Sequence, residues 1–209
     1  SILHFARGQT VIWGSGVNPK AGRWRYRSAD LDVRAVRGPI TERFLRDRGV
    51  IVPPVHGDPG LLVGRLFPGL RAAAAEAPLH AVTVVPNLNE LRTSAREGVR
   101  EDVSLDPRDD LDHVLLRIAR SGFVVGSSLH AVVVAESLGI PARFVTSAVE
   151  PELKYRDYLL GTGRSDVRLA ADLSEALALG GMPPPDVDLD RLQEAFPYDL
   201  WAPCPSRSS

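Results

Sequence analysis

The apolar positions along the chain fall into short runs that are separated by stretches with helical spacing. The runs predict strands at 11–13, 32–36, 50–52, 81–86, 123–126 and 142–145. Helices are predicted between them, one starting at Pro39 and others at 114–120, 129–138 and 174–179. Short valine-rich strands that alternate with helices indicate an α/β fold, in which helices cover both faces of a parallel sheet.

Local signals support several of these elements. Pro39 suits the first turn of a helix whose buried face would use Ile40, Phe44 and Leu45. Asp58, which precedes a proline, predicts a helix cap. Near the end of the chain, the apolar residues at 189, 192 and 196 predict one more amphipathic helix.

The stretch from 67 to 78 is rich in Gly, Ala and Pro and predicts a hinge or a short bridging helix. We expect it to end a partial N-terminal domain at 1–78. A C-terminal α/β domain would follow at 79–185, and a helix and tail at 186–209. The first domain would hold only about three strands, too few for a complete doubly wound sheet. We therefore expect that part of this domain lies upstream of the segment.

Composition narrows the classes of function. The net charge is −1, so no overall field favours nucleic acid or anionic lipid. A single cysteine, Cys204, excludes an internal disulfide, and no set of His, Asp and Glu has the spacing of metal ligands. The chain contains no apolar run of about 20 residues and no secretory signal. These features predict a cytoplasmic protein with no transmembrane segment, nucleic-acid partner or metal ion.

Polar residues gather where three of the predicted strands end. In an open α/β sheet these ends face helix N-termini, whose backbone amides can hold an anion. The three groups are Gly14, Ser15, Gly16 and Asn18 after the first strand, Arg37 after the second, and Ser127, Ser128 and His130 after the strand at 123–126. Together they predict a binding site for an anion.

Each of these residues also has an ordinary structural explanation. One of the two serines is expected to cap the following helix. A lone histidine in a first helical turn is more often exposed to solvent than catalytic. Arg37 equally fits an ion pair within the fold.

The segments RGPIT, GDPGLL and SSLHAVVVAESLGIP, in this order and spacing, resemble the polysaccharide pyruvyl transferases, and ELKYRDYL and FPYDLW extend the resemblance from Val11 to Trp201. It implies a GT-B-like architecture, in which two Rossmann-like domains face a cleft and the first domain is incomplete here. It also implies transfer of the pyruvyl group of phosphoenolpyruvate, the donor substrate, to two hydroxyls of a sugar or lipid-linked glycan as a cyclic ketal. No further cofactor is implied.

The resemblance assigns roles to individual residues. His130 would be the general acid or a phosphate contact, since imidazole is the side chain that most often does such work near neutral pH. Arg37 would hold donor charge from the opposing domain. The remaining strand-end residues would bind substrate; they are Gly14, Ser15, Gly16, Asn18, Ser127 and Ser128.

Two positions depart from the family pattern. Ser128 stands where many members have an arginine, which removes a bidentate clamp for a carboxylate. Arg143 or Lys154 would substitute for that arginine from nearby loops. Asn87 stands where many members have a histidine, so it would contact substrate without relaying a proton.

Two other functions stay open. One is a glycosyltransferase of related fold that uses a nucleotide-sugar, for which Glu136 is the one candidate ribose contact. The other is a non-catalytic module or fragment that binds a glycan or an anion. A transferase that acts on a sugar or lipid-linked glycan would associate peripherally with a glycan assembly complex at the cytoplasmic face of the membrane.

Overall fold

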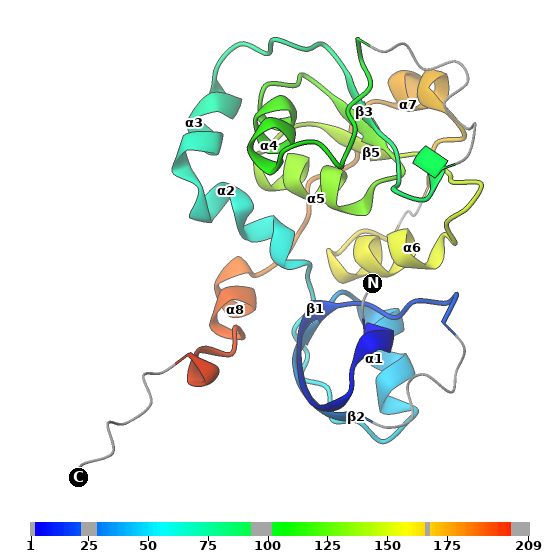
Figure 1. Cartoon of the computed structure of the whole chain (residues 1–209), viewed down its shortest axis with the longest axis vertical. Helices are drawn as coiled ribbons and strands as arrows, with labels where there is room; N and C mark the ends of the chain where they lie inside the picture. The colour runs from blue at the N-terminus through cyan, green and yellow to red at the C-terminus, as the bar shows by residue number, and fades with distance from the viewer. Residues whose placement is uncertain (1–2, 22–28, 93–101, 166–167, 202–209) are drawn as a thin grey trace.

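The computed structural model describes residues 3–21, 29–92, 102–165 and 168–201, which contain two separate parallel sheets (Figure 1). The first sheet pairs β1 (Gly8–Ser15) with β2 (Ala29–Val36). The second has the order β3-β4-β5 and consists of Thr83–Val85, Val124–Gly126 and Ala142–Phe144. The predicted α/β class with parallel sheets is confirmed, whereas the GT-B-like architecture stays a prediction.

Helix α1 (Pro39–Arg46) covers the first sheet. Its Leu45 is 1% exposed and packs in a cluster with Ile12 of β1 and Val36 of β2. The expectation of a strand at 50–52 is wrong, because these residues are irregular; the chain pairs with β2 further on, through an isolated parallel bridge between Val36 and His56. Two prolines at 53 and 54 remove the backbone donors that a further ladder would need.

Helices cover both faces of the second sheet. The adjacent residues Val124 and Val125 of β4 show this, because they belong to different apolar clusters. Val124 packs with residues of α4 (Leu111–Ala119), α5 (Leu129–Ser137) and α6 (Leu153–Gly161), and Val125 packs with residues of α7 (Leu173–Leu179). The central helix is α5, in which six of nine residues are buried, and this agrees with its almost continuous apolar sequence.

Short helices connect the two sheets. Asp58 caps the 3-10 helix η3 (Pro59–Leu62) as predicted. Helix α2 (Val63–Leu66) follows, and α3 (Pro68–Ala75) is the short helix expected at 67–78. These elements contact α4 and α5 of the second sheet. The proposed domain boundary near 78 stays a prediction.

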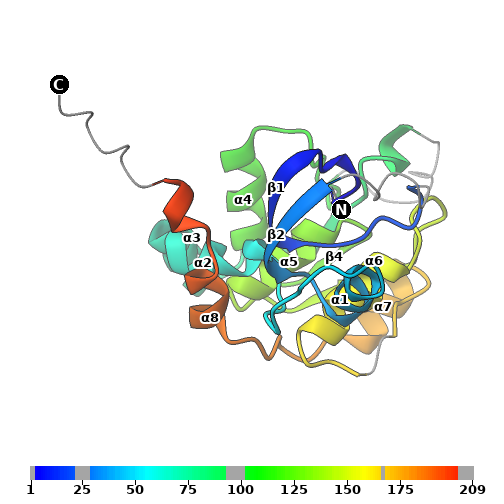
Figure 2. The same ribbon diagram turned by 90° about the horizontal axis from the view of Figure 1, so that it is seen from below.

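The end of the chain returns to the first sheet. Helix α8 (Leu189–Glu194) is followed by η5 (Tyr198–Leu200), and the indole nitrogen of Trp13 in β1 donates a hydrogen bond to the carbonyl of Leu192, 2.8 Å away. Two further 3-10 helices are η1 (Leu3–Phe5) and η4 (Glu90–Arg92). Figure 2 shows α1 beside α6, which is the main contact between helices of the two sheets. Within the described ranges, no helix is long and apolar enough to cross a bilayer.

Candidate functional site

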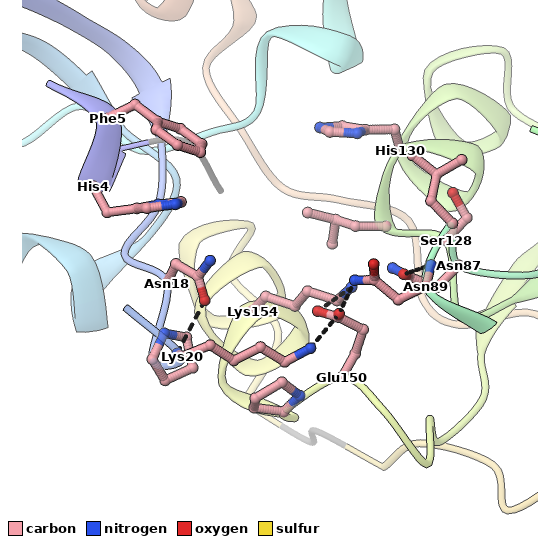
Figure 3. A pocket seen from close by; sticks show the side chains of 14 residues that line it. His4, Phe5, Asn18, Lys20, Asn87, Asn89, Ser128, His130, Glu150 and Lys154 are labelled. Atoms are coloured by element: carbon pink, nitrogen blue, oxygen red, sulfur yellow. Dashed lines mark hydrogen bonds and ion pairs between the residues drawn. The ribbon is translucent and has the colours of Figure 1, made fainter. Parts of the chain in front are cut away.

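A pocket of about 540 Å³ lies where the carboxyl ends of both sheets meet (Figure 3). Its walls come from segments that follow β1, β3, β4 and β5, from η1 and from α6. The lining residues are 4–5, 18–20, 87–89, 128–130, 150–151 and 154. Ligands of parallel sheets bind beyond these strand ends, so the pocket lies where the fold places a binding site.

The start of α5 forms one wall of the pocket. Ser128 occupies the N-cap position, but its hydroxyl makes no capping hydrogen bond. The Ser127 hydroxyl accepts a hydrogen bond from the Asn87 amide, 2.9 Å away, and donates one to the Glu90 carboxylate. The expectation that one serine caps α5 is therefore wrong, because Ser127 is engaged by Glu90 and Ser128 faces the pocket. The positive end of the helix is left for an anion.

Glu90 joins the loops behind this wall. Its carboxylate accepts hydrogen bonds from the amide of Asn87 and the hydroxyls of Ser127 and Ser147. The segments after β3, β4 and β5 are thereby tied together. Ser127 is thus placed to position these loops, and its predicted contact with substrate stays a prediction.

His130 lies in the first turn of α5 and extends into the pocket (Figure 3). Its side chain is 72% exposed, and its Nε2 atom is 3.7 Å from a carboxylate oxygen of Asp58. The other oxygen of Asp58 accepts a hydrogen bond from the amide of Gly60, which fixes this carboxylate. Asp58 can therefore orient the imidazole while leaving it accessible to a substrate.

Lys20, Lys154 and Glu150 form a charged group on the opposite wall. One oxygen of Glu150 is 2.6 Å from the ammonium of Lys20, and the other is 3.2 Å from that of Lys154. The side-chain amide of Asn89 donates a third hydrogen bond to Glu150 at 2.7 Å. Lys154, predicted from the sequence to bind substrate, is thus in the pocket, and Lys20 is a second cation that the sequence interpretation missed.

Burial and charge shift the pKa values of this group. Burial lowers the pKa of Lys154, and the positive charges of Lys20 and Arg37 act in the same direction. Burial alone would raise the pKa of Glu150. The hydrogen bonds from Lys20 and Asn89, together with the nearby ammonium of Lys154, outweigh that effect and lower this pKa to about 2. Glu150 is therefore ionised near neutral pH.

Arg37 lies outside the pocket lining. It is 1% exposed, and its Nη2 and Nε atoms lie 3.1 and 3.2 Å from a carboxylate oxygen of Asp157 in α6. Its guanidinium also packs against Gly16, where an added Cβ would lie 2.2 Å from the guanidinium carbon. Its ion pair belongs to the contact between the two sheets. The predicted role of Arg37 in holding donor charge stays a prediction.

Asp157 connects this ion pair to the loop after β1. It accepts hydrogen bonds from the backbone amides of Ile40 and Thr41 at the start of α1, both at 3.0 Å. The Thr41 hydroxyl donates to Asp157 at 2.6 Å and accepts from the amide of Val17 at 2.9 Å. The segment that carries Asn18 and Lys20 into the pocket is therefore positioned from α6.

The remaining residues that the sequence predicted for the site fall into two groups, those that line the pocket and those that do not. Asn18, Asn87, Ser128, His130 and Lys154 all line the pocket. Gly14 and Ser15 end β1 and Gly16 follows it; none of the three lines the pocket, and an added Cβ at Gly14 would lie 2.2 Å from the ring of Pro59.

Arg143 is directed elsewhere. Its guanidinium donates to the carbonyls of Gly180 and Gly181, which follow α7, and of Arg168, which precedes it. The suggestion that Arg143 replaces the missing arginine is therefore not supported by its position, and Lys154 is the one of the two that lies in the pocket.

Several pocket residues escaped the sequence interpretation. His4 and Phe5 come from η1, and Lys20, Asn89 and Glu150 come from loops. Two weak signals were available, since Lys20 lies two residues after Asn18, and Glu150 lies one helical turn before Lys154. Neither signal shows that the two segments meet.

Glu136, the candidate ribose contact of a glycosyltransferase, also lies outside this pocket. Its carboxylate is 5% exposed and pairs with the guanidinium of Arg164 at 2.5 Å and with the hydroxyl of Tyr158 at 2.5 Å. This pairing leaves the glycosyltransferase without the contact proposed for it. Among the described residues, no three His, Cys, Asp or Glu side chains are grouped in a way that could hold a metal ion; the expected independence from metal stays a prediction.

Comparison with known proteins bears on this site. The family model described as polysaccharide pyruvyl transferase matches residues 1–148, which include most of the pocket. An uncharacterized protein of Acanthamoeba polyphaga mimivirus is 28% identical over 173 residues, which are 76% of this chain and 57% of that protein. The chain thus spans less than two thirds of this relative. No solved structure matches it significantly.

Proposed function

Because the chain belongs to the polysaccharide pyruvyl transferase family, we propose that it transfers the pyruvyl group of phosphoenolpyruvate to two hydroxyls of a glycan as a cyclic ketal. The observation that supports this proposal is the pocket in which Lys20, Lys154 and the start of α5 surround the accessible imidazole of His130. An anion-binding wall beside a proton donor is what this donor substrate requires.

The donor carries a phosphate and a carboxylate, and the pocket offers a partner for each. The uncapped start of α5 suits the phosphate, since backbone amides and the helix dipole both favour an anion there. The ammonium groups of Lys20 and Lys154 suit the carboxylate through charge-assisted hydrogen bonds. Two lysines in this arrangement take the place of the arginine that Ser128 replaces.

The proposed reaction balances with one proton donor and no added reagent. Protonation of the methylene carbon of the donor makes the neighbouring carbon electrophilic, and a sugar hydroxyl attacks it with loss of its proton. The bond from this carbon to the phosphate oxygen then breaks, and the second hydroxyl attacks to close the ketal. One hydroxyl proton replaces the proton used on carbon, and the other leaves with the phosphate.

His130 is the residue that we assign to proton transfer to the methylene carbon. It is exposed to the pocket, and its Nε2 atom lies 3.7 Å from the carboxylate of Asp58. General acid catalysis by a positioned side chain contributes typically 10²–10⁴-fold to a rate. The proposal extends to a cytoplasmic location and to a lipid-linked acceptor that a glycan assembly complex presents.

The test separates donor binding from chemistry. We expect phosphoenolpyruvate at 100 times its dissociation constant to stabilise the protein by about 2.7 kcal/mol, which is visible as a higher Tm. His130→Gln should keep this shift and lose about 10²–10⁴-fold in the rate of phosphate release with an acceptor glycan. Lys154→Met should lose the shift itself. His113→Gln on α4, an exposed histidine outside the pocket, is the matched control and should behave as wild type.

Two results would overturn the proposal. One is stabilisation by phosphoenolpyruvate no greater than that by inorganic phosphate, which would indicate a general anion-binding module. The other is stabilisation by nucleotide-sugars alone, which would indicate a glycosyltransferase.

A further inference from the structure

Glu150 lies between Lys20 and Lys154 on one wall of the pocket. Its carboxylate contacts Lys20 of the segment after β1, Asn89 of the segment after β3, and Lys154 of α6, at 2.6, 2.7 and 3.2 Å. All four side chains line the same pocket (Figure 3). A carboxylate that accepts hydrogen bonds from two ammonium groups and an amide has the surroundings of a bound substrate carboxylate.

This position has an electrostatic consequence for an incoming anion. Lys20 and Lys154 supply two positive charges, and Glu150 cancels one of them. Its side chain is 12% exposed, so solvent screens these contacts only partly. An anion that binds the two lysines must therefore compete with a carboxylate that is attached to the protein and already in place.

We propose that Glu150 is an internal counter-anion, which holds Lys20, Asn89 and Lys154 in the empty pocket and is displaced when the donor binds. The inference rests on the proposed function in one respect, namely that the ligand of this wall is an anionic donor. It assigns Glu150 a part in substrate specificity.

The specificity follows from the exchange of one anion for another. A ligand with a single carboxylate replaces the Glu150 carboxylate by an equivalent group and gains little free energy. A ligand with both a carboxylate and a phosphate also reaches the start of α5, which Glu150 leaves open. Displacement of Glu150 costs both ligands the same free energy, so a simple carboxylate keeps little net affinity, whereas a ligand with two anionic groups keeps the contribution of the start of α5.

Glu150→Gln tests this inference because it removes the charge and keeps the shape and one acceptor oxygen. We expect the variant to bind acetate and inorganic phosphate at least about tenfold more tightly than wild type in titration calorimetry, a difference of 1.4 kcal/mol. Phosphoenolpyruvate must displace the same carboxylate, so it should also bind the variant more tightly, by a similar factor. Since the pocket gains net positive charge, the affinity of the variant should also depend more steeply on salt concentration.

Two further variants control the experiment. Glu152→Gln removes the same charge two residues away from an exposed side chain outside the pocket, and should bind both anions as wild type does. Lys20→Met combined with Glu150→Gln restores the original charge balance, and should return the phosphate affinity to near the wild-type value. Far-ultraviolet circular dichroism and Tm confirm that each variant is folded.

The outcomes separate this inference from the proposed function. If Glu150→Gln binds phosphate and acetate no more tightly than wild type, Glu150 is a structural support of the lysines and the inference is wrong, whether or not wild type transfers pyruvyl groups. If the variant binds both anions more tightly while phosphoenolpyruvate shows no advantage over phosphate in wild type, the counter-anion is supported and the proposed donor is wrong.

Discussion

Replacement of Asp157 by Asn is expected to destabilise the fold strongly, because it leaves Arg37 as a buried charge without its carboxylate partner. Arg37 is 1% exposed and Asp157 is fully buried. Asn keeps the size of the side chain and one oxygen that can accept from the amides of Ile40 and Thr41. The main loss is therefore the charge opposite the guanidinium.

The magnitude follows from the burial of both partners. Removal of one member of a buried ion pair costs about 3–5 kcal/mol, since the other charge stays buried without that counter-charge. With a urea dependence of about 2 kcal/mol/M, the midpoint of unfolding should fall by about 1.5–2.5 M. The contact between α1 and α6 should weaken with it.

The assay is urea unfolding followed by circular dichroism. It compares Asp157→Asn, Arg37→Met and the double variant with one control. Arg37→Met combined with Asp157→Asn should cost less than the sum of the two single changes, because it leaves no buried charge. The control is Asp199→Asn, which breaks an exposed pair with Arg34 and should leave the midpoint unchanged. A loss below about 1 kcal/mol for Asp157→Asn, or strict additivity of the two changes, would refute the reasoning.

Three further predictions concern the pocket and its surroundings. Gly16→Ala should lower the Tm, because its Cβ would lie 2.2 Å from the guanidinium carbon of Arg37; an unchanged Tm would contradict the packing. The pKa of Glu150 is depressed from 4.5 to about 2, so its contribution to stability is present above pH 4.5 and lost as the pH falls toward 2; Glu150→Gln should lack this loss in acid unfolding. Burial lowers the pKa of Lys154, so its ammonium should lose its proton below pH 10.5, and phosphate binding should weaken as the pH rises. Calorimetry can follow this weakening, and Lys154→Met should abolish the pH dependence.

Local pattern was sufficient for much of the fold. The predicted helix at 129–138 is found at Leu129–Ser137, and the helix at 174–179 is found at Leu173–Leu179. The Asp58 cap was predicted correctly because capping depends on residues close in sequence. The strand at 50–52 failed because pairing also requires free backbone donors beyond it, and two prolines remove them.

The candidate site was predictable only in part. Ser128 and His130 were identified because the end of a buried strand followed by a helix is a local signal for a binding site. The resemblance assigned Arg37 to the donor, which stays a prediction, and the alternative of an ion pair within the fold is found with Asp157, 120 residues away in the sequence. A strand-end position does not reveal whether a charged side chain meets a ligand or another element of the fold.

Local sequence patterns were enough to predict the alternation of strands and helices, the Asp58 cap, and the strand ends at which ligands can bind. These features depend on contacts within about one or two helical turns or on the burial of one face of an element. The three-dimensional packing was needed to see which strand ends share a pocket, that Arg37 pairs with Asp157, and that Glu150 contacts a lysine 130 residues earlier. The physical reason is that such pairings depend on how two separately formed sheets pack, which no local pattern encodes.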